Sequence, residues 1–287
     1  MNRICRAGDV EIGAGRPLAI IAGPCVLESL GLGLEVGRVA RDACRALGLS
    51  YIFKASFDKA NRTSVDSPRG PGIDKGLDWL AQIGEQLGVP VTSDVHDPAQ
   101  CLAVAERVDL LQIPAFLCRQ TDLLFAAGDA AARHQRGVNV KKGQFLSPDE
   151  MRGPIDKLAS VGCDNVMLTE RGTFFGYGRL VNDFIGVAEM MALGIRGGPP
   201  PVCFDCTHST QRPGLGEGGK VTGGARGMAP MLARAATAAG VHALFMECHP
   251  EPMTALSDKA TMLRLDEVPG LLGQVAALRG VLGASGA

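Results

Sequence analysis

The amino-acid sequence predicts one (β/α)₈ (TIM) barrel that spans residues 1–287, and three observations support this prediction. The length suits a single large α/β domain, because barrels of this class often reach it without dividing. Short apolar runs alternate with segments whose apolar residues follow helical spacing, which is the pattern of a parallel sheet built from βαβ units. Eight such runs recur, and this number favours a closed barrel over an open, doubly wound sheet.

The expected strands are, in chain order, 18–23, 51–56, 90–95, 110–115, 138–143, 165–172, 201–208 and 243–249. Between them, helical spacing is clearest over 30–47, 75–87 and 121–134. The residues before position 18 are expected to form a short β-ribbon that caps the bottom of the barrel.

Composition limits the classes of partner. Hydrophobic residues make up 46% of the chain, charged residues 21%, and the net charge is −1, so neither nucleic acid nor an anionic membrane is expected as a partner. The nine cysteines form no disulfide-like framework, and no secretory signal or membrane-length apolar run is found. These features predict a reduced, cytoplasmic setting with free thiols.

The predicted strands end in polar or metal-binding residues, which indicates a functional site at the carboxyl face of a barrel. A single end of this kind is usually an ordinary solvated strand end, but the pattern recurs around the whole predicted ring. The residues in question include Cys25, Lys54, Asp94, His96, Gln112, Lys141, Arg171, His208 and Glu247.

The densest group of anion-binding side chains is the run FKASFDKANRTS at 53–64, which supplies lysines, an arginine and hydroxyl groups just beyond a strand. Alone it could equally be a solvated loop. Arg119, Lys141, Lys142 and Arg171 follow other strands, and all four are expected to face the same cavity. This concentration of positive charge predicts substrates that carry several negative charges.

A second group combines a thiol, an imidazole and two carboxylates. Cys25, His208 and Glu247 end the first, seventh and eighth strands, which are neighbours in a closed barrel, and Asp258 follows the eighth. Such ligands suit Zn²⁺, Fe²⁺, Mn²⁺ or Co²⁺. The alternatives are a buried thiol at Cys25 and a hydrogen-bonded barrel residue at His208, because no short ligand motif is present.

Three further features have weaker interpretations. The CxxC formed by Cys203 and Cys206 is interpreted as coincidental, because residues three apart on a strand face opposite sides. Cys206 shares parity with His208 and could line the barrel, but packing is its expected role. His96 and His249 could each be a proton donor or a structural hydrogen-bonding residue. The glycine-rich segment 214–227 is interpreted as a lid over the site.

Long stretches of the sequence resemble one family. The motifs are GPCVLES at 23–29, the 53–64 run, QIPAFLCRQ at 112–120, NVKKGQF at 139–145, LTERG at 168–172 and FMECHPEP at 245–252. Together they are similar to 3-deoxy-D-manno-octulosonate 8-phosphate synthase, also called 2-dehydro-3-deoxyphosphooctonate aldolase. The resemblance covers nearly the whole chain, from about position 18 to position 258.

This resemblance implies a homotetrameric TIM-barrel enzyme that joins phosphoenolpyruvate to D-arabinose 5-phosphate for lipopolysaccharide synthesis. It implies a phosphoenolpyruvate site made by Ser56, Lys59, Gln112, Ala115, Lys141 and Arg171. Arabinose 5-phosphate is expected at Asn61, Arg62 and Thr63, with Arg119 reaching it from a neighbouring subunit, and with Asp94 and His96 also in contact with substrate. The residues expected to act in catalysis are Lys59, Asn61, Lys141 and His208.

Within the resembled family, some members need no metal and have asparagine where Cys25 stands. Cys25 with His208, Glu247 and Asp258 therefore implies the metal-requiring class. Three alternatives are left open: the related synthase that uses erythrose 4-phosphate, a Schiff-base aldolase with Lys141 or Lys142 as nucleophile, and a non-catalytic sugar-phosphate-binding barrel. The pair Ala60-Asn61 favours the five-carbon sugar over erythrose 4-phosphate.

Overall fold

A computed structural model of the chain describes residues 3–60, 68–216 and 222–285. Eight parallel strands of this described part close into a ring, which confirms the predicted barrel. The strands are β3 (Ala19–Gly23), β4 (Ser50–Lys54), β5 (Val91–Asp94), β6 (Leu110–Ile113), β7 (Gly137–Lys141), β8 (Val166–Glu170), β9 (Val202–Asp205) and β12 (Ala243–His249). The ring closes because β12 pairs with both β9 and β3.

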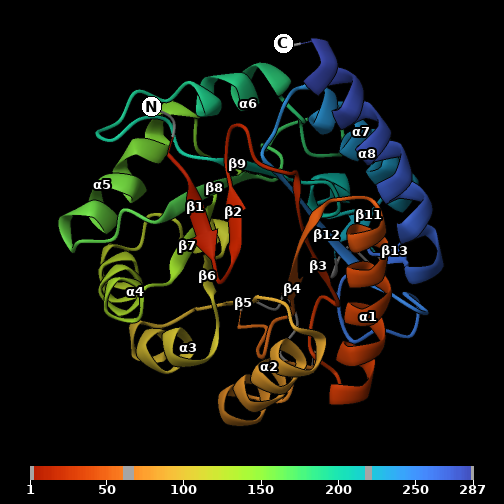
Figure 1. Cartoon of the computed structure of the whole chain (residues 1–287), viewed down its shortest axis with the longest axis horizontal. Helices are drawn as coiled ribbons and strands as arrows, with labels where there is room; N and C mark the ends of the chain where they lie inside the picture. The colour runs from red at the N-terminus through yellow and green to blue at the C-terminus, as the bar shows by residue number, and fades with distance from the viewer. Residues whose placement is uncertain (1–2, 61–67, 217–221, 286–287) are drawn as a thin grey trace.

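Helices surround the ring of strands (Figure 1). In the described residues they are α1 (Leu30–Ala46), α2 (Ile73–Leu87), α3 (Cys101–Arg107), α4 (Thr121–His134), α5 (Arg152–Ser160), α6 (Phe184–Met191), α7 (Ala229–Ala238) and α8 (Val268–Ser285). Local signals set several of their ends: the Ser29 hydroxyl caps α1, and Gly88 ends α2 in a left-handed conformation. No helix in these ranges combines the length and apolar character needed to cross a membrane.

The residues before the barrel form the predicted ribbon. Strands β1 (Cys5–Ala7) and β2 (Val10–Ile12) pair in antiparallel register and lie across the near end of the barrel in Figure 1. Their apolar residues pack with the inward-facing side chains at the amino-terminal ends of the barrel strands, such as Ile21 and Leu110. The ribbon thus covers the bottom of the barrel with apolar surface.

Each strand alternates between an inner and an outer face, as period-two geometry requires. On β4, Ile52 belongs to the inner cluster, whereas Tyr51 and Phe53 pack in the layer between strands and helices. Two residues beyond Ile52, on the same inner face of the strand, is Lys54, which lines a cavity at the carboxyl end of the barrel. The same alternation carries β9 from Cys203 to Asp205 and β12 from Phe245 to Glu247.

This alternation decides the role of Cys206. Cys206 packs in the outer layer, and its thiol donates to the Phe245 carbonyl at 3.3 Å, so the expected packing role is confirmed and Cys206 does not line the barrel. Strand β9 ends at Asp205 and a turn of 3₁₀ helix begins at His208, so the parity that links these positions is broken. The two sulfurs of the CxxC do lie on opposite faces, as expected.

Candidate active site

A cavity of about 940 Å³ opens at the carboxyl ends of the strands. Most of the strands place at least one polar side chain in it, either from their last inward position or from the loop that follows. The charged and polar lining residues include Lys54, Lys59, Asp94, His96, Gln112, Lys141, Arg171, His208, Gln211, Glu247 and Asp258. The cavity therefore brings together the strand-end residues that the sequence separates widely.

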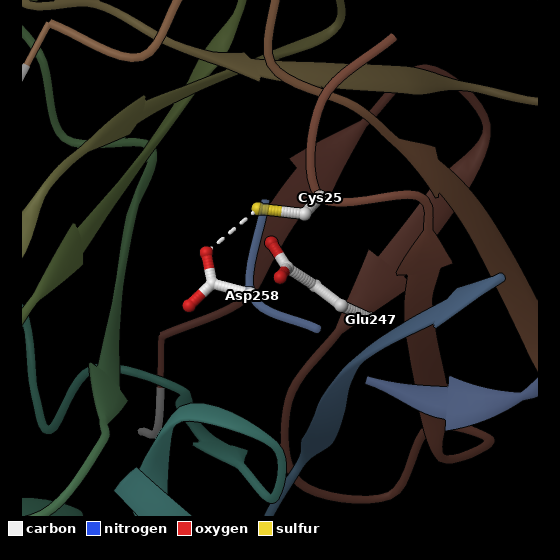
Figure 2. A group of neighbouring side chains, drawn as sticks. All are labelled: Cys25, Glu247 and Asp258. Carbon is white, nitrogen blue, oxygen red and sulfur yellow. Dashed lines mark hydrogen bonds between the residues drawn. The ribbon is translucent and has the colours of Figure 1, made fainter. Parts of the chain in front are cut away.

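Three potential metal ligands converge on one wall of this cavity. Figure 2 shows the Cys25 thiol and the carboxylates of Glu247 and Asp258 pointing toward one another, with the thiol hydrogen-bonded to Asp258 at 2.9 Å. Their ligand atoms all lie within 4.8 Å of one another. His208 stands beside them, with its Nε2 atom 3.4 Å from Glu247 Oε2.

The chemistry of this cluster fits a divalent cation. Burial, together with the carboxylates of Asp258 and Glu247, raises the pKa of the Cys25 thiol well above its usual value. Glu247 Oε2 is buried and has no hydrogen-bond partner within the described ranges. A buried acceptor without a donor is costly, and a bound cation would satisfy it. The residues present therefore fit a Zn²⁺, Fe²⁺, Mn²⁺ or Co²⁺ ion.

The backbone around the cluster is shaped to bring the ligands together. Gly23 precedes Cys25 at the end of β3, and a Cβ atom there would lie 1.9 Å from the Lys54 carbonyl oxygen, so only glycine fits. Asp258 has a φ of +48°, a left-handed conformation that aspartate tolerates better than most residues. Backbone strain of this kind often accompanies function.

Cationic side chains line the rest of the cavity. Lys54 Nζ contacts Glu247 Oε1 at 2.5 Å, Lys59 Nζ donates to the Ser56 hydroxyl at 2.9 Å, and Lys141 Nζ contacts Asp205 at 2.7 Å. Arg171 donates from Nη2 to Gln211, while its buried Nη1 has no partner among the described residues. Lys59, which donates to a hydroxyl rather than to a carboxylate, and the unpaired guanidinium nitrogen of Arg171 offer donors to an anionic ligand.

Asp94 connects this cationic wall to the barrel interior. Its carboxylate accepts from the Ser56 hydroxyl and, at 2.6 Å, from Gln112 Nε2. Although burial opposes ionisation, the nearby positive charges of Lys54 and Lys59 hold the pKa of Asp94 well below its usual range. Next to it, burial lowers the pKa of His96, whose buried Nδ1 is without a partner in the described part of the chain.

The structure places the remaining expected residues as follows. Ala115 lines the cavity, and Ser56 is buried just behind Lys59. Asn61, Arg62 and Thr63 lie outside the described residues. Arg119 is exposed and is not one of the described residues that line the cavity of its own chain.

The expectation that Lys142 faces the cavity is wrong. Lys141 ends the inner face of β7, so the next residue points into the outer layer, where Lys142 Nζ lies 3.4 Å from Glu170 Oε2 and donates to the Leu146 carbonyl at 3.0 Å. Asp205, which contacts the cavity residues Lys141 and His208, had been given no role from the sequence, and Lys54 had been expected only as a strand-end lysine of the 53–64 run. Counting by two along each strand from its apolar inner residues would have found both.

Comparison with known proteins identifies the family. Residues 2–279 match the model of the DAHP synthetase I family. The chain belongs to this family. Its relatives named 2-dehydro-3-deoxyphosphooctonate aldolase include proteins from Cyanothece sp., at 51% identity over 98% of this chain and 99% of the relative, and from Citrifermentans bemidjiense, at 49% over the same shares. A third, from Nitratidesulfovibrio vulgaris strain DP4, is 51% identical over 90% of this chain and 91% of its own. These matches confirm the resemblance seen in the motifs.

Proposed function

We propose that this enzyme condenses phosphoenolpyruvate with D-arabinose 5-phosphate and water to give 3-deoxy-D-manno-octulosonate 8-phosphate and inorganic phosphate. The observation that carries the proposal is one cavity that brings together two chemically different groups: the cationic Lys59, Lys141 and Arg171, and the Cys25–Glu247–Asp258 cluster. Relatives at about half identity over nearly the full length carry the matching name. The whole chain would act as one catalytic domain.

Phosphoenolpyruvate would bind to the cationic residues of the cavity. Lys59, Lys141 and Arg171 supply donors for its carboxylate and phosphate, and the unpartnered Nη1 of Arg171 is a donor free for this purpose. Gln112 and the Ala115 backbone would help to hold the enol in one orientation. Holding the substrate in this way lowers the entropic part of the barrier, and the fixed positive charges stabilise negative charge as it develops.

In the proposed reaction, C3 of phosphoenolpyruvate attacks the sugar aldehyde and water adds to C2. The resulting tetrahedral intermediate loses phosphate by C–O cleavage. Cys25, Glu247 and Asp258, with His208 beside them, would hold a divalent ion that supplies a Lewis acid to the site. Lys141 would hold or move a proton next to the reacting atoms, His208 would act by helping to hold the ion, and His96 would contact substrate in the cavity.

The sugar phosphate would extend toward the mouth of the cavity. Asn61, Arg62 and Thr63 are proposed to bind it, together with Arg119 from a neighbouring subunit of a homotetramer. Exposed aromatic side chains near this mouth support assembly: Phe116 is 51% exposed, and Phe175 and Tyr177 are each 98% exposed. A cytoplasmic role in lipopolysaccharide synthesis completes the proposal.

The deciding experiment measures phosphate release from phosphoenolpyruvate with either arabinose 5-phosphate or erythrose 4-phosphate, with and without a chelator. Chelator-sensitive release with the five-carbon sugar is expected; preference for erythrose 4-phosphate would instead indicate the seven-carbon synthase. Run in ¹⁸O-labelled water, the reaction should label the keto acid, and label in phosphate would exclude C–O cleavage.

Lys141→Met and Lys142→Met form a matched pair for the same assay. The first should lose at least about 100-fold in kcat/KM, the scale of losing a fixed electrostatic contact in an active site. The second removes a lysine that faces the outer layer and should retain most of the activity. Equal losses in the two variants would contradict the proposed site.

A further inference from the structure

Asp205, at the last inward position of β9, makes an unusual number of contacts for one buried side chain. It is completely buried. Oδ1 accepts hydrogen bonds from the Thr207 backbone at 3.1 Å, the Thr207 hydroxyl at 3.1 Å and the His208 backbone at 2.9 Å. These local bonds leave the carboxylate with one orientation, in which Oδ2 faces Lys141 and His208.

Oδ2 contacts two residues that line the cavity. Lys141 Nζ lies 2.7 Å away, and His208 Nδ1 lies 2.7 Å away next to the metal-ligand cluster. A carboxylate can only accept, so Nδ1 of His208 carries the proton in this contact. In the neutral ring the lone pair is therefore on Nε2, the nitrogen that lies 3.4 Å from Glu247 Oε2.

We infer that Asp205 is a positioning residue that orients His208 toward the ion-binding cluster and holds the Lys141 ammonium in place, so that one carboxylate positions both residues. A carboxylate or carbonyl behind a ligating histidine fixes its tautomer and ring orientation in this way. Phe245 limits Lys141 from the other side, since its ring centroid lies 3.6 Å from Nζ. The inference rests on the proposed function, because it assigns Asp205 to that same site.

A matched control lies beside this pair, in the lysine that follows Lys141 and its own carboxylate partner. Lys141 and Lys142 are consecutive, and each pairs with a buried carboxylate: Lys141 with Asp205 inside the barrel, and Lys142 with Glu170 outside it. Asp205→Asn and Glu170→Gln therefore each remove one buried negative charge beside a lysine while keeping side-chain shape. Only the first should affect the ion site.

The experiment measures Co²⁺ affinity by chelator competition in the metal-free full-length wild type and both variants. We expect Asp205→Asn to bind Co²⁺ about 10- to 100-fold more weakly, the range found for residues behind metal ligands, and Glu170→Gln to stay within about threefold of wild type. Unchanged Co²⁺ affinity in Asp205→Asn, or equal weakening in the two variants, would overturn the inference.

Turnover gives a separate measurement. In Asp205→Asn, kcat should fall while KM for phosphoenolpyruvate changes little, because Lys141 keeps its charge but loses its fixed position. A change confined to KM would also overturn the inference.

Nitrogen NMR of the metal-free wild type provides a second test that does not depend on the folding of Asp205→Asn. The His208 signals, assigned by their loss in His208→Gln, should show a protonated Nδ1 at mildly alkaline pH, because the Asp205 carboxylate accepts from it. An unprotonated Nδ1 would contradict the inference. Absence of phosphate release by the wild type would reject the proposed function, whereas the Co²⁺ comparison would still decide the role of Asp205.

Discussion

The two ends of the barrel interior are built from the same strands but have opposite character. At the amino-terminal end, inward side chains such as Ile21, Ile52 and Leu110 pack against the β1–β2 ribbon with complete exclusion of solvent. On β4 the inner face changes from Ile52 to Lys54, two residues further along the strand. On β7 it changes from Gly137 to Lys141, four residues further along, and both lysines line the cavity. The change from apolar to charged occurs within one strand.

This difference separates stability from function along each strand. The apolar end contributes burial, at roughly 25 cal/mol for each Å² of apolar surface removed from water. The other end holds buried charges, which are costly unless they are paired. Pairs such as Lys54–Glu247 and Lys141–Asp205 offset part of that cost and leave polar atoms for a ligand. Substitutions at the two ends should therefore have different consequences.

The largest effect is expected at the carboxyl end, for Cys25→Ala. Loss of the thiolate ligand should weaken Co²⁺ binding by more than roughly 100-fold, because that is the upper range for residues that only support a ligand. It should also remove the thiolate-to-cobalt absorption band. The fold should survive, as judged by circular dichroism. Cys206→Ala removes a buried thiol from the outer layer and should keep both the absorption band and the Co²⁺ affinity. If Cys206→Ala also lost the band and the affinity, the effect of Cys25→Ala would not be specific to the charged end of the barrel.

The next effect is expected at the apolar end, for Ile52→Ala. Ile52 is fully buried in the inner cluster, so its truncation should lower the free energy of unfolding by about 2–5 kcal/mol, and Ile52→Val by about 0.5–1.5 kcal/mol. Urea unfolding measures both. The value of kcat in the folded enzyme should change little, and a parallel fall in kcat would show that the two ends are coupled.

Gly137→Ala should produce a smaller loss of stability by disturbing the ribbon. A Cβ atom at Gly137 would lie 2.8 Å from the Arg6 carbonyl oxygen and 2.8 Å from Leu110 Cδ1, so the ribbon must shift. Overpacking of this kind costs about 1–3 kcal/mol. Thermal unfolding and proteolysis of the N-terminus would measure it. Gly153→Ala in α5, where the new methyl group meets no atom within 4 Å, provides the control and should not destabilise.

The smallest effect concerns the dependence of stability on pH at the charged end. The pKa of Asp94 is lowered in the folded state, so below its unfolded value of about 3.9 unfolding takes up a proton and stability is lost as the pH falls. Relative to Asp94→Asn, wild type should lose about 1.4 kcal/mol per pH unit in this range. Urea unfolding from about pH 5 to pH 3 measures the difference; parallel curves for the two proteins would remove Asp94 as the cause.

Much of the fold followed from the sequence. The alternation of strand and helix signals located all eight barrel strands within a few residues, and the helix at 121–134 has the bounds that its apolar spacing predicts. These features are local: they depend on period, capping and glycine or proline at the ends, which are all visible in a short window. The position of polar residues at strand ends was visible for the same reason.

The tertiary structure alone decided which of these polar residues share the cavity. Adjacent lysines on β7 look alike in sequence, yet only Lys141 faces inward, because the outer layer of helices and the closed ring set the register of every strand. Cys25 and Asp258 are 233 positions apart and meet only because β12 pairs with β3. The sequence by itself determined the kinds of chemistry available and their order along the chain. Ring closure decided their convergence, because side chains from distant strands become neighbours only when the first and last strands join.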